Sequence, residues 1–239
     1  MPERTRGLAH QRDPTDYYAT APELARLVCQ TIRGDFGLSA PERILEPGCG
    51  AGTFLSAIRD TWPQAELFGV EIQKELAEFA KRAGFDVAIG DVLSHALDEV
   101  DLIVGNPPFR YADEFIPVLL RHLRPGGVLA FILRLNFLAG GKRYGTLWTK
   151  YPPARIYPLP SRPGFTADGG TDATDYMVCV WVANHTGPTI MTHLDNRNVA
   201  NRWTDATAYP DPRTPSDARI SPGVTLNRWS APERRKVMP

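Results

Sequence analysis

The sequence has 239 residues, of which 43% are hydrophobic and 23% are charged, and this is the composition of a globular protein. No apolar run reaches the roughly 18 residues of a membrane-spanning helix, and the polar N-terminus lacks the apolar core of a secretory signal, so we expect a cytoplasmic protein. The 27 basic and 27 acidic residues cancel, which argues against indiscriminate binding to nucleic acid.

Helices and strands are expected to alternate along most of the chain. The expected helices cover residues 15–32, 53–61, 73–83 and 112–123. The expected strands cover residues 43–46, 66–72, 86–89, 101–104, 127–133, 154–159 and 176–182. This alternation predicts an α/β fold with one doubly wound, mostly parallel sheet of seven strands and right-handed crossovers.

The two ends of the chain differ from this central part. From residue 195 onward, prolines recur among Asp, Arg, Thr and Asn with almost no apolar periodicity. Such a segment cannot build a core, so residues 195–239 are predicted to be a tail that is either extended over the domain or disordered. Residues 15–194 then form a single domain, and residues 1–14 are a short N-terminal lead.

Basic side chains are concentrated in one part of the sequence. Residues 115–167 carry eight basic and no acidic residues, although the chain has 27 acids. We interpret this segment as a surface that faces a polyanion, with chance and solvated helix faces as the alternative. The candidate nucleic-acid-binding residues are Arg134, Lys142, Arg143, Lys150, Arg162 and Phe165. Arg162 offers a phosphate contact and Phe165 an exposed aromatic ring, unless their segment is an ordinary hairpin loop.

A glycine-rich turn follows the first expected strand. Residues 46–52 read Glu-Pro-Gly-Cys-Gly-Ala-Gly and lead directly into the helix expected at 53–61. Ligands of doubly wound sheets bind at this edge, where glycines let them approach the backbone. The spacing favours a nicotinamide dinucleotide less, because Thr53 occupies the third glycine position of that fingerprint. Taken alone, the glycines could equally serve packing.

Acidic residues stand at the ends of three successive expected strands. Glu46 ends the first, Glu71 the second, and Asp91 follows the third. The carboxyl ends of parallel strands meet at one edge of the sheet, where a carboxylate can accept hydrogen bonds from both ribose hydroxyls and another from an adenine amine. Each acid alone would be an ordinary loop residue, but together they indicate a nucleoside-binding site.

These motifs resemble those of the class I S-adenosylmethionine-dependent methyltransferases, over residues 16–182. The resemblance implies S-adenosylmethionine as cofactor, with glycines near its methionine part, Glu46 at its amino group, Glu71 at the ribose and Asp91 at the adenine. Residues 16–22 look like the N-terminal cofactor-contacting motif of adenine methyltransferases, although Ala21 separates Thr20 from Pro22. The implied cofactor-binding residues are Tyr17, Thr20, Glu46, Gly48, Gly50, Gly52, Glu71, Ile72, Asp91 and Val92.

The chemical motif is Asn106-Pro107-Pro108-Phe109, which follows the strand expected at 101–104. An aromatic amine is a poor nucleophile because the ring shares its lone pair. The amide oxygen of Asn106 and the carbonyl of Pro107 could accept the two amino hydrogens and favour a tetrahedral nitrogen. Pro108 would stiffen the loop, and Phe109 would stack on a base outside the duplex. The alternative is a proline-stiffened turn with Phe109 in the core.

This motif resembles that of amino-methyltransferases acting on DNA adenine, on ribosomal RNA bases and on a release-factor glutamine. The order of the motifs is similar to that of γ-type DNA adenine methyltransferases, and the glutamine enzymes carry Tyr where this chain has Phe109. We therefore expect methyl transfer to the exocyclic amine of adenine in DNA. An RNA amine is the main alternative, followed by a protein glutamine and by a non-enzymatic nucleic-acid-binding protein. The spacing of Cys29, Cys49 and Cys179 suggests no metal site.

Overall fold

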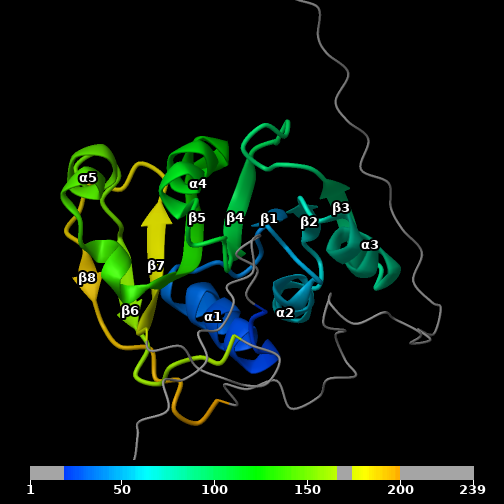
Figure 1. Cartoon of the computed structure of the whole chain (residues 1–239), viewed down its shortest axis with the longest axis horizontal. Coiled ribbons are helices and arrows are strands. Elements are labelled where there is room, and N and C mark those ends of the chain that lie inside the picture. Colours follow the sequence, from blue (N-terminus) through cyan, green and yellow to red (C-terminus); the bar gives the residue numbers. More distant parts are fainter. Residues whose placement is uncertain (1–18, 166–173, 200–239) are drawn as a thin grey trace, which may run out of the picture.

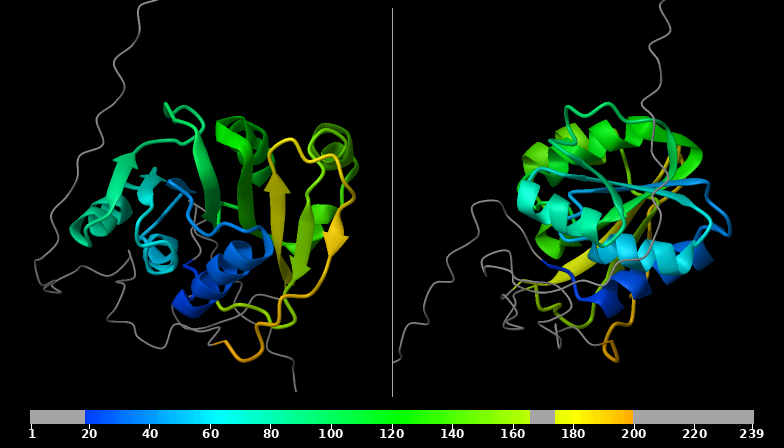
Figure 2. Two further views of the ribbon diagram at one scale, coloured as in Figure 1. Left: turned by 180° about the vertical axis from the view of Figure 1, so that it is seen from behind. Right: turned by 90° about the vertical axis from the view of Figure 1, so that its right-hand side faces the viewer.

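The computed structural model describes residues 19–165 and 174–199. In this part of the chain, an eight-stranded sheet lies between two layers of helices, as Figure 1 and Figure 2 show. The strands are β1 (Arg43–Pro47), β2 (Glu66–Glu71), β3 (Asp86–Ile89), β4 (Val100–Gly105), β5 (Leu123–Arg134), β6 (Arg155–Pro158), β7 (Tyr176–Val182) and β8 (Ile190–Met191). The α-helices are α1 (Pro22–Asp35), α2 (Thr53–Thr61), α3 (Lys74–Arg82), α4 (Ala112–Leu119) and α5 (Gly141–Arg143). None of the described helices is long and apolar enough to cross a membrane.

The strand order is β3-β2-β1-β4-β5-β7-β6-β8. Strands β1 to β5 pair in parallel, whereas β7 lies antiparallel between β5 and β6. Figure 1 shows this reversal, since the β7 arrow points opposite to those of β6 and β8. The order reverses direction after β1, so the carboxyl ends of β1 and β4 adjoin at a switch point of the kind where open α/β sheets bind ligands.

Both faces of the sheet are covered because its central strands are apolar on both sides. In β5, Val128, Ala130 and Ile132 pack against the α1 and α2 layer. The alternate residues Leu129, Phe131 and Leu133 pack on the α4 side. Successive side chains of a strand point to opposite faces, so this buried run makes β5 the centre of two cores.

Most of the expected elements are confirmed. The bounds of α2, β3 and β7 are those predicted, and β1, β2, β4 and β6 differ by one or two residues. Helix α1 begins at Pro22, not residue 15, because proline suits a first helical turn and residues 19–21 are not helical. The predicted lead at residues 1–14 and most of the predicted tail at residues 195–239 lie outside the described residues.

Two expectations about the fold are wrong. The sheet has eight strands instead of seven, because the short strand β8 pairs with β6 through Ile190 and Met191. No helix is predicted between the strands expected at 127–133 and 154–159, but most of residues 138–150 are helical: a 3-10 turn (Leu135–Leu138) leads into α5 and a π-helix (Tyr144–Trp148). Both features are short and carry too little apolar periodicity for a sequence pattern to reveal them.

Candidate functional site

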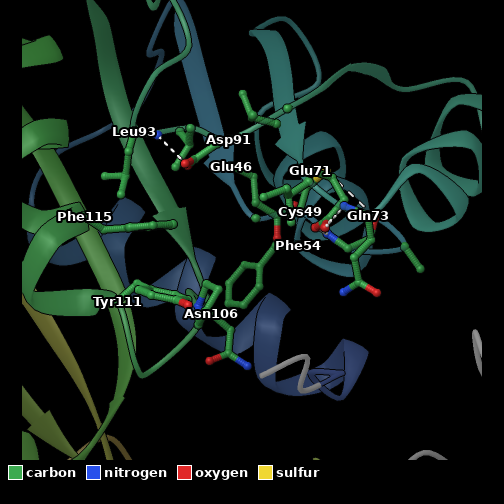
Figure 3. Close-up of a pocket in the computed structure, with 18 of the residues that line it drawn as sticks. Glu46, Cys49, Phe54, Glu71, Gln73, Asp91, Leu93, Asn106, Tyr111 and Phe115 are labelled. Carbon is green, nitrogen blue, oxygen red and sulfur yellow. Dashed lines mark hydrogen bonds between the residues drawn. The ribbon is translucent and has the colours of Figure 1, made fainter. Parts of the chain in front are cut away.

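A cavity of about 340 Å³ opens at the carboxyl ends of β1, β2, β3 and β4. This volume is in the range of small-molecule and cofactor sites. Residues from all four strand ends line it, together with Ala19 and Thr20 before α1. Figure 3 shows Phe54 of α2 between the acidic side chains and Asn106 in this view. The sheet therefore brings the two motif groups, the glycine turn with its acids and the Asn-Pro-Pro turn, to one pocket.

The glycine turn owes its shape to left-handed backbone conformations. Gly48, Gly50 and Gly52 have φ values of 69°, 53° and 92°. Residues with a Cβ adopt such angles only at a cost, so these positions require glycine. Gly48 and Gly50 line the pocket, whereas Gly52 lies outside its lining, contrary to expectation, and a Cβ there would lie 3.2 Å from the Phe85 ring. Gly52 therefore lies close to Phe85, and its predicted cofactor contact stays a prediction.

Glu71 is held in place by backbone hydrogen bonds. Its two carboxylate oxygens accept from the N–H groups of Gly50 and Gln73, each at 2.8 Å. Burial raises the pKa of Glu71, and these backbone donors oppose the rise. Because a carboxylate oxygen has more than one lone pair, each can still accept from a ligand hydroxyl. The side chain is a fixed acceptor at the end of β2.

Glu46 is the most completely buried acid of the pocket, with 3% of its surface exposed. Burial, together with repulsion from Glu71, raises its pKa well above the usual 4.5, although the N–H of Leu55 donates to the carboxyl group. Its Oε2 atom has no hydrogen-bond partner among the described residues. A buried acceptor without a partner is costly, so this atom is suited to a cationic or N–H group of a ligand.

The end of β3 supplies the outer wall. Asp91 accepts a hydrogen bond from the N–H of Leu93 at 3.0 Å, and Figure 3 shows this contact at the pocket edge. Val92 is buried and Ile72 is 64% exposed, and both line the pocket. A polar acceptor beside apolar side chains is suited to the edge and face of a purine.

The Asn-Pro-Pro turn approaches the glycine turn directly. Asn106 and Pro108 line the pocket, and a Cβ added to Gly48 would lie 3.5 Å from Cδ of Pro108. Asn106 donates from Nδ2 to Oγ1 of Thr20 at 3.1 Å. Pro107 is buried and outside the lining. A neutral amide is thereby placed beside the glycine turn, where it can orient a substrate but cannot act as a base at neutral pH.

Phe109 lies outside the pocket lining, in an aromatic cluster. Its ring centroid is 5.7 Å from that of Tyr176 and 6.3 Å from that of Phe165. The guanidinium of Arg134 lies over the ring, 4.9 Å from its centroid. Phe109 is half-buried. Its role as a base-stacking residue stays a prediction.

The candidate nucleic-acid-binding residues are placed in different surroundings. Phe165 is only 7% exposed, so the expected exposed aromatic ring is wrong; Tyr176 packs edge-on against it at 4.8 Å. Arg162 forms an ion pair with Asp175 at 2.8 Å. Arg143 donates from Nε to the carbonyl of Phe137. Lys142 and Lys150 are exposed.

Two other basic residues of the segment 115–167 are also paired with acids. Arg124 contacts Glu42 and Asp101, and Arg155 contacts Asp35. Basic residues of the segment 115–167 therefore form ion pairs with acidic residues from other parts of the chain. The net positive charge of this surface is smaller than the count of its basic residues implies. The exposed lysines on the α4 side are the best remaining candidates for a polyanion contact.

Sequence reasoning overlooked several pocket residues. Phe54, Gln73, Leu93, Tyr111, Glu114 and Phe115 all line the cavity. Their signal is positional: each stands within a few residues of a motif, at the start of α2, α3 or α4 or in the turn after β3. Tyr17, expected to contact the cofactor, lies outside the described residues.

The fold is that of the class I S-adenosylmethionine-dependent methyltransferases. Residues 44–127 match the family model described as a methyltransferase domain. A class I S-adenosylmethionine-dependent methyltransferase of Listeria monocytogenes has a similar structure, with a TM-score of 0.62 at 16% identity over 84% of this chain and 70% of that one. S-adenosylmethionine is the methyl donor of such domains.

Two curated relatives are methyltransferases of different names. A type II methyltransferase of Paramecium bursaria Chlorella virus XZ-6E is 29% identical over 149 residues, which cover 54% of this chain and 38% of the relative. A trans-aconitate 2-methyltransferase of Azoarcus sp. (strain BH72) is 35% identical over 131 residues, which cover 52% of this chain and 51% of the relative. The chain thus spans about half or less of the length of these relatives.

The pocket residues fit this cofactor. Oε2 of Glu46, without a hydrogen-bond partner among the described residues, suits the ammonium group of the methionine part. The carboxylate of Glu71, fixed by backbone donors, suits the ribose hydroxyls, and Asp91 with Val92 suits the adenine. Bound there, the cofactor supplies an electrophilic methyl group on a sulfonium centre.

Proposed function

We propose that this chain transfers a methyl group from S-adenosylmethionine to the exocyclic amine of adenine in DNA. One observation carries the proposal: Asn106 and Pro108 line the same pocket as Glu46, Glu71 and Asp91. A neutral amide beside a nucleoside-type cofactor site is suited to a planar amine, because such a nitrogen needs hydrogen-bond acceptors more than it needs a base.

The chemistry assigned to the chain's residues follows from this placement. Oδ1 of Asn106 and the carbonyl of Pro107 accept the two hydrogens of the amine. Accepting both hydrogens draws the lone pair of the nitrogen away from the ring and toward the methyl group. As the nitrogen bonds the methyl carbon, the carbon–sulfur bond of the donor would break, and the methylated nitrogen would then release one hydrogen as a proton to water. Rigid prolines keep the two acceptors at a fixed spacing. Phe109 presents an aromatic face to the base once it has left the helix stack.

DNA is favoured as the polymer by the likeness to the viral type II methyltransferase and by the exposed lysines Lys142 and Lys150. A small carboxylic acid is the second candidate, because the Azoarcus relative is a trans-aconitate methyltransferase. The pocket favours it less: Glu114, which has no assigned cofactor contact, also lines the cavity, and its carboxylate would repel an anionic substrate.

The proposal is tested with S-adenosylmethionine carrying a labelled methyl group. Duplex DNA, single-stranded DNA, ribosomal RNA, release-factor protein and trans-aconitate are offered in parallel, and the labelled product is digested and identified. We expect label in DNA as N6-methyladenine. The Asn106→Ala protein, checked for unchanged cofactor binding, serves as the background.

Each alternative has its own outcome in this assay. Label in RNA alone, or in protein alone, would keep the amine chemistry and replace the polymer. Label in trans-aconitate alone would overturn the amine as the acceptor. Absence of label in all substrates, with nucleic acid still bound, would favour a non-enzymatic nucleic-acid-binding protein.

A further inference from the structure

The amide of Asn106 is held by a residue from a distant part of the chain. Nδ2 of Asn106 lies 3.1 Å from Oγ1 of Thr20, which is 86 positions away in the sequence. Thr20 is 4% exposed and is followed by Ala21 and Leu24, which are fully buried at the start of α1. The hydroxyl is therefore anchored by the core beneath it and does not move freely with a surface loop.

This contact distinguishes the two ends of the amide. A carboxamide can rotate to exchange its oxygen and its NH₂ group, which have nearly the same shape but opposite hydrogen-bonding character. An amine to be methylated offers hydrogens, so it needs the oxygen; the NH₂ group would meet it donor to donor. A hydroxyl that accepts from Nδ2 fixes the rotation in which Oδ1 is the acceptor offered to the substrate.

We propose that Thr20 is a positioning residue for methyl transfer: its hydroxyl orients Asn106 so that Oδ1 accepts from the substrate amine. The inference rests on the proposed function and assigns Thr20 a role beyond a cofactor contact. Oγ1 accepts from Asn106 and still has its own hydrogen to donate into the pocket that both residues line.

The test compares Thr20→Val with Thr20→Ser. Valine keeps the size and branching of threonine but lacks the hydroxyl, whereas serine keeps the hydroxyl. For Thr20→Val we expect kcat at saturating cofactor to fall about 10-fold, as loss of one orienting hydrogen bond predicts. The dissociation constant of S-adenosylmethionine, measured by calorimetry, should change less than about threefold, and Thr20→Ser should restore kcat.

If Thr20 only contacts the cofactor, Thr20→Val should change the dissociation constant of S-adenosylmethionine and leave kcat unchanged. If Thr20→Val raises the dissociation constant of S-adenosylmethionine while kcat at saturation stays at the wild-type value, the positioning role is overturned. Methylation of DNA by the wild-type protein is the separate test of the proposed function. The variants are compared on whichever acceptor the wild-type protein methylates.

A second measurement does not depend on activity. The NH₂ resonances of Asn106 in a ¹⁵N-labelled protein are identified by their loss in Asn106→Ala. We expect these resonances to shift in Thr20→Val and to stay near their wild-type position in Thr20→Ser. Unchanged resonances in Thr20→Val would show that the hydroxyl does not hold the amide, and would overturn the proposal even if no acceptor substrate is found.

Discussion

The two ends of the pocket are held together by different kinds of contact. At the cofactor end, backbone N–H groups bind the carboxylates: those of Gly50 and Gln73 hold Glu71, and that of Leu93 holds Asp91. At the Asn-Pro-Pro end, side chains from distant segments meet. Asn106 contacts Thr20, and the Phe109 ring packs near Tyr176 and Phe165.

The two kinds of contact differ in how strongly the fold determines them. Backbone contacts at strand ends follow from sheet register, so they persist whenever the strands pair. Side-chain contacts between distant segments can be rebuilt by a few substitutions, and under the proposed function they include Asn106, which binds the acceptor amine. Methyltransferases of different names match this chain over about half its length.

The largest effect is expected from removing the Asn106 amide, which should affect kcat but not cofactor binding. Asn106→Ala should lower kcat by about 100-fold to 1,000-fold, because it deletes an acceptor that acts on the reacting nitrogen. The dissociation constant of S-adenosylmethionine should stay near the wild-type value, since the cofactor end keeps its contacts. Steady-state kinetics and calorimetry measure the two quantities. The exposed Asn136→Ala is the matched control, and a fully active Asn106→Ala protein would refute the proposed chemistry.

Glu71→Ala is expected to weaken cofactor binding more than it lowers kcat. The change removes an acceptor for the ribose and the partner of the N–H groups of Gly50 and Gln73. We expect the dissociation constant of S-adenosylmethionine to rise about 10-fold to 100-fold, the range for hydrogen bonds to a charged group. At saturating cofactor, kcat should fall much less. Glu75→Ala, on the exposed side of α3, is the control; equal losses in binding and in kcat would mean that the two ends are not separable.

Residues at the cofactor end of the pocket could be placed from the sequence better than those at the Asn-Pro-Pro end. The glycine turn and Glu71 could be placed because strand ends and left-handed glycines have local signatures. The contact of Asn106 with Thr20 and the packing of Phe109 with Phe165 could not, since they join segments that no local pattern relates. The burial of Phe165 and the eighth strand were missed for the same reason: both depend on the partner, β6 for β8 and Tyr176 for Phe165.

Phe109 tests whether the aromatic cluster serves the substrate or the core. Phe109→Leu keeps most of the apolar volume but lacks an aromatic face, and we expect kcat/KM for DNA to fall about 10-fold from lost stacking. Phe137→Leu is the matched control, because its ring also lies beneath an arginine, Arg143, and is outside the pocket lining. Should both variants lose only thermal stability, with unchanged kcat/KM, Phe109 is a packing residue.

A smaller effect is expected from the exposed lysines. Lys142→Ala and Lys150→Ala should each raise KM for DNA about threefold at moderate salt, and should each reduce by about one the slope of log affinity against log salt concentration, as loss of a phosphate contact does. The value of kcat should not change, because both lysines are away from the pocket lining. The exposed Lys74→Ala, on α3, is the control. An unchanged salt slope in both variants would remove this surface from the DNA contact.

The smallest expected effect is a pH-dependent rise in Tm when Glu46, at the cofactor end, is replaced by glutamine. Burial and Glu71 raise the pKa of Glu46 above 4.5. Between pH 4.5 and the folded-state pKa, Glu46 is therefore protonated in the folded protein and ionised in the unfolded chain. The stability that the protonated group contributes is complete below pH 4.5 and is lost as pH rises through the folded-state value. Glutamine is isosteric and uncharged, so Glu46→Gln should leave Tm unchanged in acid.

Above that range, the same substitution should raise Tm in the absence of cofactor, by a margin that grows with pH until the folded-state pKa is passed. The exposed Glu75→Gln should show no such trend. The ammonium group of S-adenosylmethionine would favour the charged form of Glu46, so cofactor should stabilise the wild-type protein more than the variant. A Tm difference independent of pH would mean that the carboxylate of Glu46 is already compensated in the folded protein, and the argument for an ammonium partner would fail.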